Sequence, residues 1–132
     1  MSHDATAPPV PPSRRERLRV LVVDDHDSFR FAARAVLAVA GFDVVGEAVD
    51  GATALHQVEA LCPDVVLLDV GLPDLDGFDV CDRLSRLARP PAVVLVSSRD
   101  ASEYGDRVAD SAARGFLPKS RISGPAVVDL VR

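Results

Sequence analysis

Residues 64–80 read DVVLLDVGLPDLDGFDV, which joins an apolar run, an aspartate and a turn-rich loop in one continuous stretch. The run over 64–69 is typical of a strand that is buried on both faces, and it ends on Asp69. Glycine, proline and aspartate crowd the loop over 70–76, as a tight connection requires. Asp76 can cap a helix over 77–87, because its carboxylate can accept a hydrogen bond from a free backbone N–H. The stretch therefore predicts a strand, a loop and a helix, with a carboxylate at the strand's end.

The same strand-then-helix order recurs on both sides of that stretch. Further strands are predicted by short apolar runs over 18–23, 43–48, 92–96 and 115–117. Further helices are predicted over 28–40, 51–61, 102–113 and 124–130, and Gly41 and Pro63 provide stops for the first two. Strands joined by helical crossovers form one parallel sheet, because the crossovers are right-handed. We expect an α/β fold: a flavodoxin-like, doubly wound, five-stranded parallel sheet in the order 2-1-3-4-5, with helices on both faces.

Length and composition limit the class of protein. A chain of 132 residues with 48% apolar residues fits one compact domain with a sizeable core. The formal net charge of −5 argues against a nucleic-acid-binding domain, which usually has a basic face. No apolar run approaches the roughly 20 residues of a membrane span, and the first residues do not resemble a signal peptide. We expect a cytoplasmic protein that contacts neither nucleic acid nor membrane through this domain.

The first 16 residues differ in composition from the rest. Four prolines among small and charged residues predict a disordered tail over 1–16, which leaves 17–132 as the folded domain. Cys62 and Cys81 are too few, and too far from metal-ligand or redox spacing, to predict a disulfide scaffold or a zinc site. We expect both to be small, partly buried apolar residues.

Acidic side chains follow two strands that would be neighbours in this sheet. Asp24 and Asp25 follow the strand over 18–23, and Asp69 ends the strand over 64–69. At the carboxyl edge these three carboxylates would converge where the winding of the sheet reverses. Their mutual repulsion would be relieved by a hard divalent cation, and Mg²⁺ suits a site of two or three carboxylates.

A hydroxyl and an ammonium are predicted at the same edge. Ser97 follows the fourth strand and Lys119 follows the fifth. Beside a metal-bound carboxylate, these groups would hydrogen-bond and balance the charge of a phosphoryl group, and Asp69 could be the nucleophile that accepts it. Each residue alone has an ordinary explanation, such as a helix cap, a turn or an exposed lysine. Complementary side chains at four strand ends favour a phosphoryl acceptor.

From about residue 18 onward the sequence resembles the response-regulator receiver domains of two-component signalling. The resemblance rests on LVVDD at 21–25, the stretch over 64–80, VVLVSS at 93–98 and GFLPKS at 115–120, and it is closest to receivers that usually carry a helix-turn-helix output domain. It implies that Asp69 is the phospho-acceptor, and that Mg²⁺ is held by Asp24, Asp25, Asp69 and the backbone carbonyl of Gly71. It further implies phosphate contacts from Ser97, Ser98 and Lys119, and a switch formed by Ser97 and Phe116.

The resemblance also implies partners and an output. The phosphoryl donor would be a phosphohistidine on a sensor histidine kinase or phosphotransfer protein. The domain would catalyse phosphorylation and dephosphorylation of its own aspartate only, so it would not be an enzyme acting on other molecules. The signal would leave through the surface of the last helix and the two elements before it, with homodimer formation on phosphorylation as one outcome.

Three alternatives stay open at this point. A metal-dependent aspartyl-phosphate phosphatase would want a second acid two residues after the nucleophile, where this chain has Gly71. An interaction module that works without phosphorylation is disfavoured, because all five site positions carry competent side chains. For Phe116, packing in the core competes evenly with a switching role, since an aromatic residue on a strand usually just fills space.

Overall fold

The computed structural model describes residues 17–132, so the tail predicted over 1–16 lies outside the described residues. The strands are β1 (Arg19–Val23), β2 (Asp43–Ala48), β3 (Val65–Asp69), β4 (Ala92–Ser97) and β5 (Gly115–Pro118). The helices are α1 (Asp27–Val39), α2 (Gly51–Leu61), α3 (Gly77–Ser85), α4 (Arg107–Asp110) and α5 (Gly124–Val131). Single turns of 3₁₀ helix, η1 (Ala101–Tyr104) and η2 (Lys119–Arg121), complete the chain.

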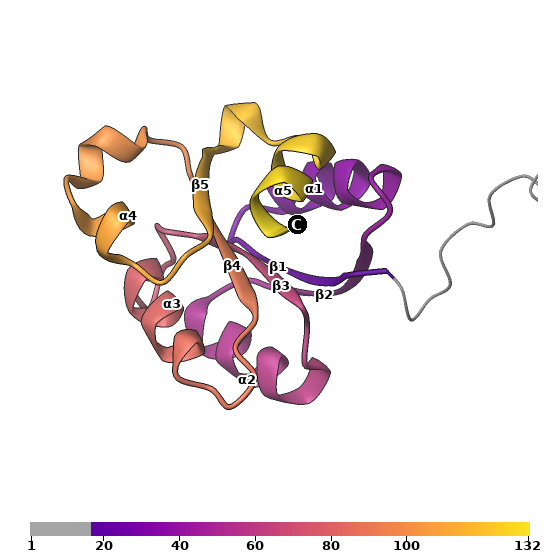
Figure 1. The fold of residues 1–132 in the computed structure, drawn as a ribbon, viewed down its shortest axis with the longest axis horizontal. Helices are drawn as coiled ribbons and strands as arrows, with labels where there is room; N and C mark the ends of the chain where they lie inside the picture. The colour runs from indigo at the N-terminus through magenta and orange to yellow at the C-terminus, as the bar shows by residue number, and fades with distance from the viewer. Residues whose placement is uncertain (1–16) are drawn as a thin grey trace, which may run out of the picture.

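The five strands form one sheet in the order β2-β1-β3-β4-β5, and every neighbouring pair is parallel. Helices α1 and α5 lie together on one face, and α2 and α3 lie on the other (Figure 1). The predicted flavodoxin-like fold and its strand order are therefore confirmed. The central strands β1 and β3 neighbour each other, as the expected site requires.

The core lies in two layers, one on each face of the sheet. Because side chains alternate along a strand, Leu21 and Val23 of β1 pack with α2 and α3, while Val20 and Val22 pack with α1 and α5. All four side chains are fully buried. Each contributes on the order of 1.5–3 kcal/mol of hydrophobic stabilisation, so the ends of these strands are held rigidly.

Predicted helix ends and caps agree with the structure at most positions. Gly41 follows α1 with a φ of 92°, which glycine adopts without strain. Asp76 caps α3 by accepting a hydrogen bond from the Phe78 N–H at 2.7 Å. The expectation for the cysteines was half correct: Cys81 is buried, but Cys62 is exposed at the end of α2 in the left-handed conformation.

The helix predicted over 102–113 is wrong. In its place, η1 is followed by Gly105 with φ 59° and ψ −130°, and α4 is only four residues long. That glycine conformation lies far from helical values, so a continuous helix cannot pass through it. Asp100 and Glu103 also form a reciprocal capping box that closes the 3₁₀ turn on itself.

Among residues 17–132, no helix has the length and hydropathy needed to cross a membrane.

Candidate phosphoryl-acceptor site

The predicted acidic cluster is present at the carboxyl edge of β1 and β3. Asp24 is completely buried and Asp69 is 4% exposed, whereas the side chain of Asp25 is about a third exposed. One ligand atom from each of Asp24, Asp25, His26 and Asp69 lies within 4.8 Å of the others. The three aspartates were predicted from the sequence, but His26 was not.

Lys119 lies inside this cluster. Its Nζ is 2.6 Å from Asp24 Oδ2 and 3.2 Å from Asp69 Oδ2, and its side chain is only 16% exposed. Burial alone would lower the pKa of Lys119, but the paired carboxylates outweigh that effect, so the pKa is raised and the ammonium stays charged. The ordinary explanation, a merely exposed lysine, is therefore wrong for Lys119.

Asp69 is held by its own loop. Its Oδ1 accepts a hydrogen bond from the Gly71 N–H at 3.0 Å. Burial raises the pKa of Asp69, the Gly71 N–H opposes that rise, and repulsion from Asp24 adds to it. The family resemblance implies that the Gly71 carbonyl holds the metal, and this role stays a prediction. The structure shows the Gly71 N–H donating to the Asp69 carboxylate.

Gly77 is a further residue that sequence analysis did not single out. A Cβ at this position would lie 2.5 Å from the Asp69 carbonyl oxygen and 2.6 Å from Val70 Cα. Both contacts are with backbone atoms, which cannot rotate away. Only glycine therefore lets the first turn of α3 approach the end of β3 this closely, and that approach fixes the backbone of Asp69.

Arg30 supports the acidic pair from α1 and was also missed. One of its nitrogens donates to the Asp24 carbonyl at 2.7 Å, and its Nε donates to Glu47 at 3.0 Å. It also pairs with Asp27, three residues earlier on the same helix. Burial opposes the charge, but the two carboxylates outweigh it and raise the pKa of Arg30. The spacing of Asp27 and Arg30 was the available signal in the sequence.

The two serines after β4 differ in burial. Ser97 is 3% exposed, and its Oγ lies 2.5 Å from the Tyr104 hydroxyl and accepts a hydrogen bond from the Arg99 N–H at 3.0 Å. Ser98 is exposed and lines the same hollow as Asp69. Within residues 17–132, no hydrogen bond joins Ser97 to Asp69 or Lys119.

Phe116 is half-buried on β5 and packs against the α2–α3 side of the core. Its ring centroid is 5.9 Å from that of Tyr104, and Tyr104 in turn makes an edge-on contact with Phe78 at 5.5 Å. The geometry is compatible with packing and with switching, so a switching role for Phe116 stays a prediction.

A pocket of about 340 Å³ opens over the Asp69 carboxylate. Its lining includes Asp69, Gly71, Ser97, Ser98, Tyr104 and Lys119. The side chains of the acidic cluster fit a hard divalent cation, because most of their ligand atoms are carboxylate oxygens. The buried Asp24 Oδ2 has no polar partner among the described residues apart from the Lys119 ammonium. A cation held beside it would balance the excess negative charge of the cluster.

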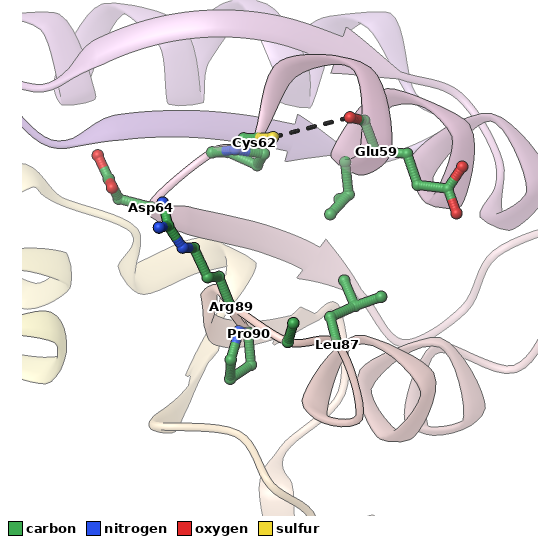
Figure 2. A pocket seen from close by; sticks show the side chains of 9 residues that line it. Glu59, Cys62, Asp64, Leu87, Arg89 and Pro90 are labelled. Carbon is green, nitrogen blue, oxygen red and sulfur yellow. Dashed lines mark hydrogen bonds between the residues drawn. The ribbon is translucent and has the colours of Figure 1, made fainter.

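A second pocket, of about 480 Å³, lies at the opposite edge of the sheet, before β3 and β4 (Figure 2). Val58, Leu87 and Pro90 give it an apolar lining, and the Cys62 thiol contacts the Glu59 carbonyl at 3.7 Å. It shares no residue with the acidic cluster. The acidic cluster and this pocket are therefore separate features at opposite edges of the sheet.

Comparisons with known proteins agree with this site. A protein-family model, the response regulator receiver domain, matches residues 20–128. The "Probable transcriptional regulatory protein NarL" of Mycobacterium tuberculosis is 40% identical over 105 residues, which are 79% of this chain and 49% of that protein. The "DNA-binding transcriptional activator EvgA" of Escherichia coli is 30% identical over 102 residues, which are 77% of this chain and 50% of that protein.

Structural similarity leads to the same family. The solved signal receiver domain of NarL from Mycobacterium tuberculosis has a TM-score of 0.80 and 36% identity, and the match covers 87% of this chain and 96% of that one. The chain spans about half the length of the curated relatives it matches, which are named as transcription regulators. With its sheet order, its acidic pocket and a family model that matches most of its length, this chain belongs to the response regulator receiver domain family of two-component systems.

Proposed function

We propose that this domain is a phosphorylation-dependent signalling switch that accepts a phosphoryl group on Asp69. The observation that carries the proposal is the contact of one partly buried ammonium, that of Lys119, with both Asp24 and Asp69 at the switch point of the sheet. A buried carboxylate beside a fixed cation is a nucleophile whose negative product is stabilised in advance. The donor is a phosphohistidine of a sensor histidine kinase or a phosphotransfer protein.

In the transfer, a carboxylate oxygen of Asp69 forms a bond to phosphorus while the bond between phosphorus and the donor imidazole nitrogen breaks. The departing nitrogen takes the electron pair and is left as neutral imidazole once protonated. The Gly71 N–H at Oδ1 fixes the orientation of the carboxylate during this step. The Lys119 ammonium lies near Oδ2, so it can pair with the negatively charged phosphoryl oxygens once they are bound there.

The acidic cluster supports a site for Mg²⁺. Asp24, Asp25, Asp69 and the carbonyl of Gly71 would hold the ion, which supplies positive charge for the transferring phosphoryl oxygens. Asp24 is held in place for this task by the Arg30 contact to its carbonyl. Because the Asp25 side chain is partly exposed, water could reach the ion and complete its ligands.

After transfer, Ser97 and Ser98 would donate hydrogen bonds to the phosphoryl oxygens. Movement of Ser97, with Phe116, would shift the population of conformations at the surface of α4, β5 and α5. That surface would contact the output, which in this group of receivers is a helix-turn-helix domain, or a second copy of the chain. No chemistry on a separate substrate is proposed; the domain modifies only itself.

The test is labelling by acetyl phosphate with and without Mg²⁺. Wild-type protein should take up one phosphoryl group in a Mg²⁺-dependent manner, and Asp69→Asn should take up none. Asp79→Asn, which changes an exposed carboxylate on α3, is the matched control and should label normally. Stoichiometric labelling of Asp69→Asn would refute the assignment.

A further inference from the structure

Tyr104 occupies a position that makes it more than a filler of the core. It is the single tyrosine of the chain, and its hydroxyl lies 2.5 Å from Ser97 Oγ, the hydroxyl expected to reach the phosphoryl group. The two residues come from different elements, since Ser97 ends β4 and Tyr104 ends η1. The contact therefore connects the acceptor pocket to the segment between β4 and β5.

The Ser97 hydroxyl already makes two hydrogen bonds within the domain. A serine hydroxyl has one proton and two acceptor lone pairs. The Arg99 N–H uses one lone pair, and Tyr104 uses either the proton or the second lone pair. Both partners belong to the segment that follows β4. When the Ser97 proton is the one shared with Tyr104, the hydroxyl must turn away from Tyr104 before it can donate to a phosphoryl oxygen on Asp69.

The Tyr104 ring is itself fixed by aromatic packing. It lies between Phe78 of α3, at a centroid distance of 5.5 Å, and Phe116 of β5, at 5.9 Å. The Arg107 guanidinium lies 4.3 Å from the Phe78 ring centroid and pairs with Asp76 at 2.8 Å. This packing keeps the hydroxyl pointed at Ser97 rather than at solvent.

We propose that Ser97 donates its proton to Tyr104 and that Tyr104 is a positioning residue, which retains the Ser97 hydroxyl in the unphosphorylated arrangement. Loading of Asp69 must then break this hydrogen bond and release η1 (residues 101–104). The proposal rests on the proposed function and adds a restraint to it. A contact made in only one of two states shifts their populations toward that state. Tyr104 thus lowers the apparent affinity for a phosphoryl group or its mimic.

The segment that would respond is suited to a change of position. It is the 3₁₀ turn η1, which is joined to the α-helical turn α4 through Gly105 at a φ of 59°. Figure 1 shows it as the orange segment between β4 and β5, on the side of the sheet away from α1 and α5. Release of Tyr104 would free the side chain that anchors η1 to the site, while Arg107 still anchors α4 to α3.

Tyrosine fluorescence provides a direct measurement, because the chain has one tyrosine and no tryptophan. Emission from Tyr104 should change when wild-type protein is titrated with beryllofluoride and Mg²⁺, and should stay constant in Asp69→Asn. The emission of Ser97→Ala without beryllofluoride should already match that of the saturated wild type. Emission that does not respond in the wild type, or Ser97→Ala emission equal to the unliganded wild type, overturns the proposal.

Tyr104→Phe removes the hydroxyl and keeps the ring between its neighbours. Since one hydrogen bond contributes about 0.5–1.5 kcal/mol, calorimetry should show beryllofluoride binding about 2- to 10-fold more tightly in this variant. An unchanged or lower affinity overturns the role of Tyr104 while leaving the proposed function intact. Failure of the wild type to bind beryllofluoride with Mg²⁺ would instead overturn the proposed function, and this proposal with it.

Discussion

Replacing Lys119 by methionine tests the electrostatic design of the site. The substitution keeps an unbranched side chain of similar length and removes the ammonium that lies between two buried carboxylates. Asp24 is fully buried and Asp69 is 4% exposed, so neither charge can be fully solvated once the cation is gone. Lys119→Met should therefore be strongly destabilised in the absence of divalent metal.

The magnitude follows from the burial of the cluster. Removing one partner of a buried ion pair costs about 3–5 kcal/mol. The lower end applies, because the Lys119 side chain is 16% exposed and water reaches the Asp25 side of the cluster. A loss of about 3 kcal/mol, with a urea m-value of about 1.5 kcal/mol/M, would lower the unfolding midpoint by about 2 M.

The assay is urea unfolding at pH 7 in the presence of EDTA. Arg121→Met, which changes an exposed basic residue two positions further on, is the matched control and should unfold close to wild type. Asp24→Asn in the Lys119→Met background should recover part of the loss, since one of the unpaired charges is removed. Mg²⁺ should stabilise Lys119→Met more than wild type. A Lys119→Met midpoint equal to wild type in EDTA would refute the reasoning.

Three other substitutions test the supports of the site. Gly77→Ala should destabilise the domain by about 1–3 kcal/mol and slow acetyl-phosphate labelling, because its Cβ would clash with the backbone of Asp69; normal stability by urea unfolding would contradict this. Backbone N–H groups in the first turn of α2 donate hydrogen bonds to Asp74 and lower its pKa. The stability that Asp74 contributes to the domain should therefore be complete above about pH 4 and be lost as the pH falls through that lowered pKa. Asp74→Asn should therefore melt below wild type at pH 7, and the difference should shrink below pH 4; a difference that is constant with pH would contradict this. Arg30→Ala should cost about 1–2 kcal/mol and weaken Mg²⁺ binding in a calorimetric titration, because it loses the hydrogen bond to the Asp24 carbonyl; unchanged Mg²⁺ affinity would contradict this.

The main features of the fold could be predicted because they depend on local signals. Each strand is a short apolar run, and the polar residue that ends it marks the carboxyl edge, as Asp69 does for β3. The wrong prediction of a long helix between β4 and β5 also has a physical cause. The composition over 102–113 permits a helix, but the conformation of Gly105 and the capping box of Asp100 with Glu103 end it after one turn.

The sequence by itself determined the alternation of strands and helices along the chain. It also determined the identity of the carboxylates, the hydroxyl and the ammonium at the strand ends. It did so because hydrophobic period and strand-end chemistry are local properties. Only the tertiary structure decided which groups touch. Lys119 reaches Asp69 across 50 residues because β3, β4 and β5 pair in register, with Asp69 opposite Val96 and Ser97 opposite Pro118.

The same reason applies to the contacts that the sequence did not reveal. Arg30 meets Asp24 because α1 packs back against β1, and Gly77 fits against Asp69 because α3 begins directly on the end of β3. Tyr104 is only seven residues from Ser97, yet no periodicity shows that a 3₁₀ turn directs its hydroxyl inward. The sequence thus determined what chemistry the site contains, and packing between elements decided which atoms restrain it.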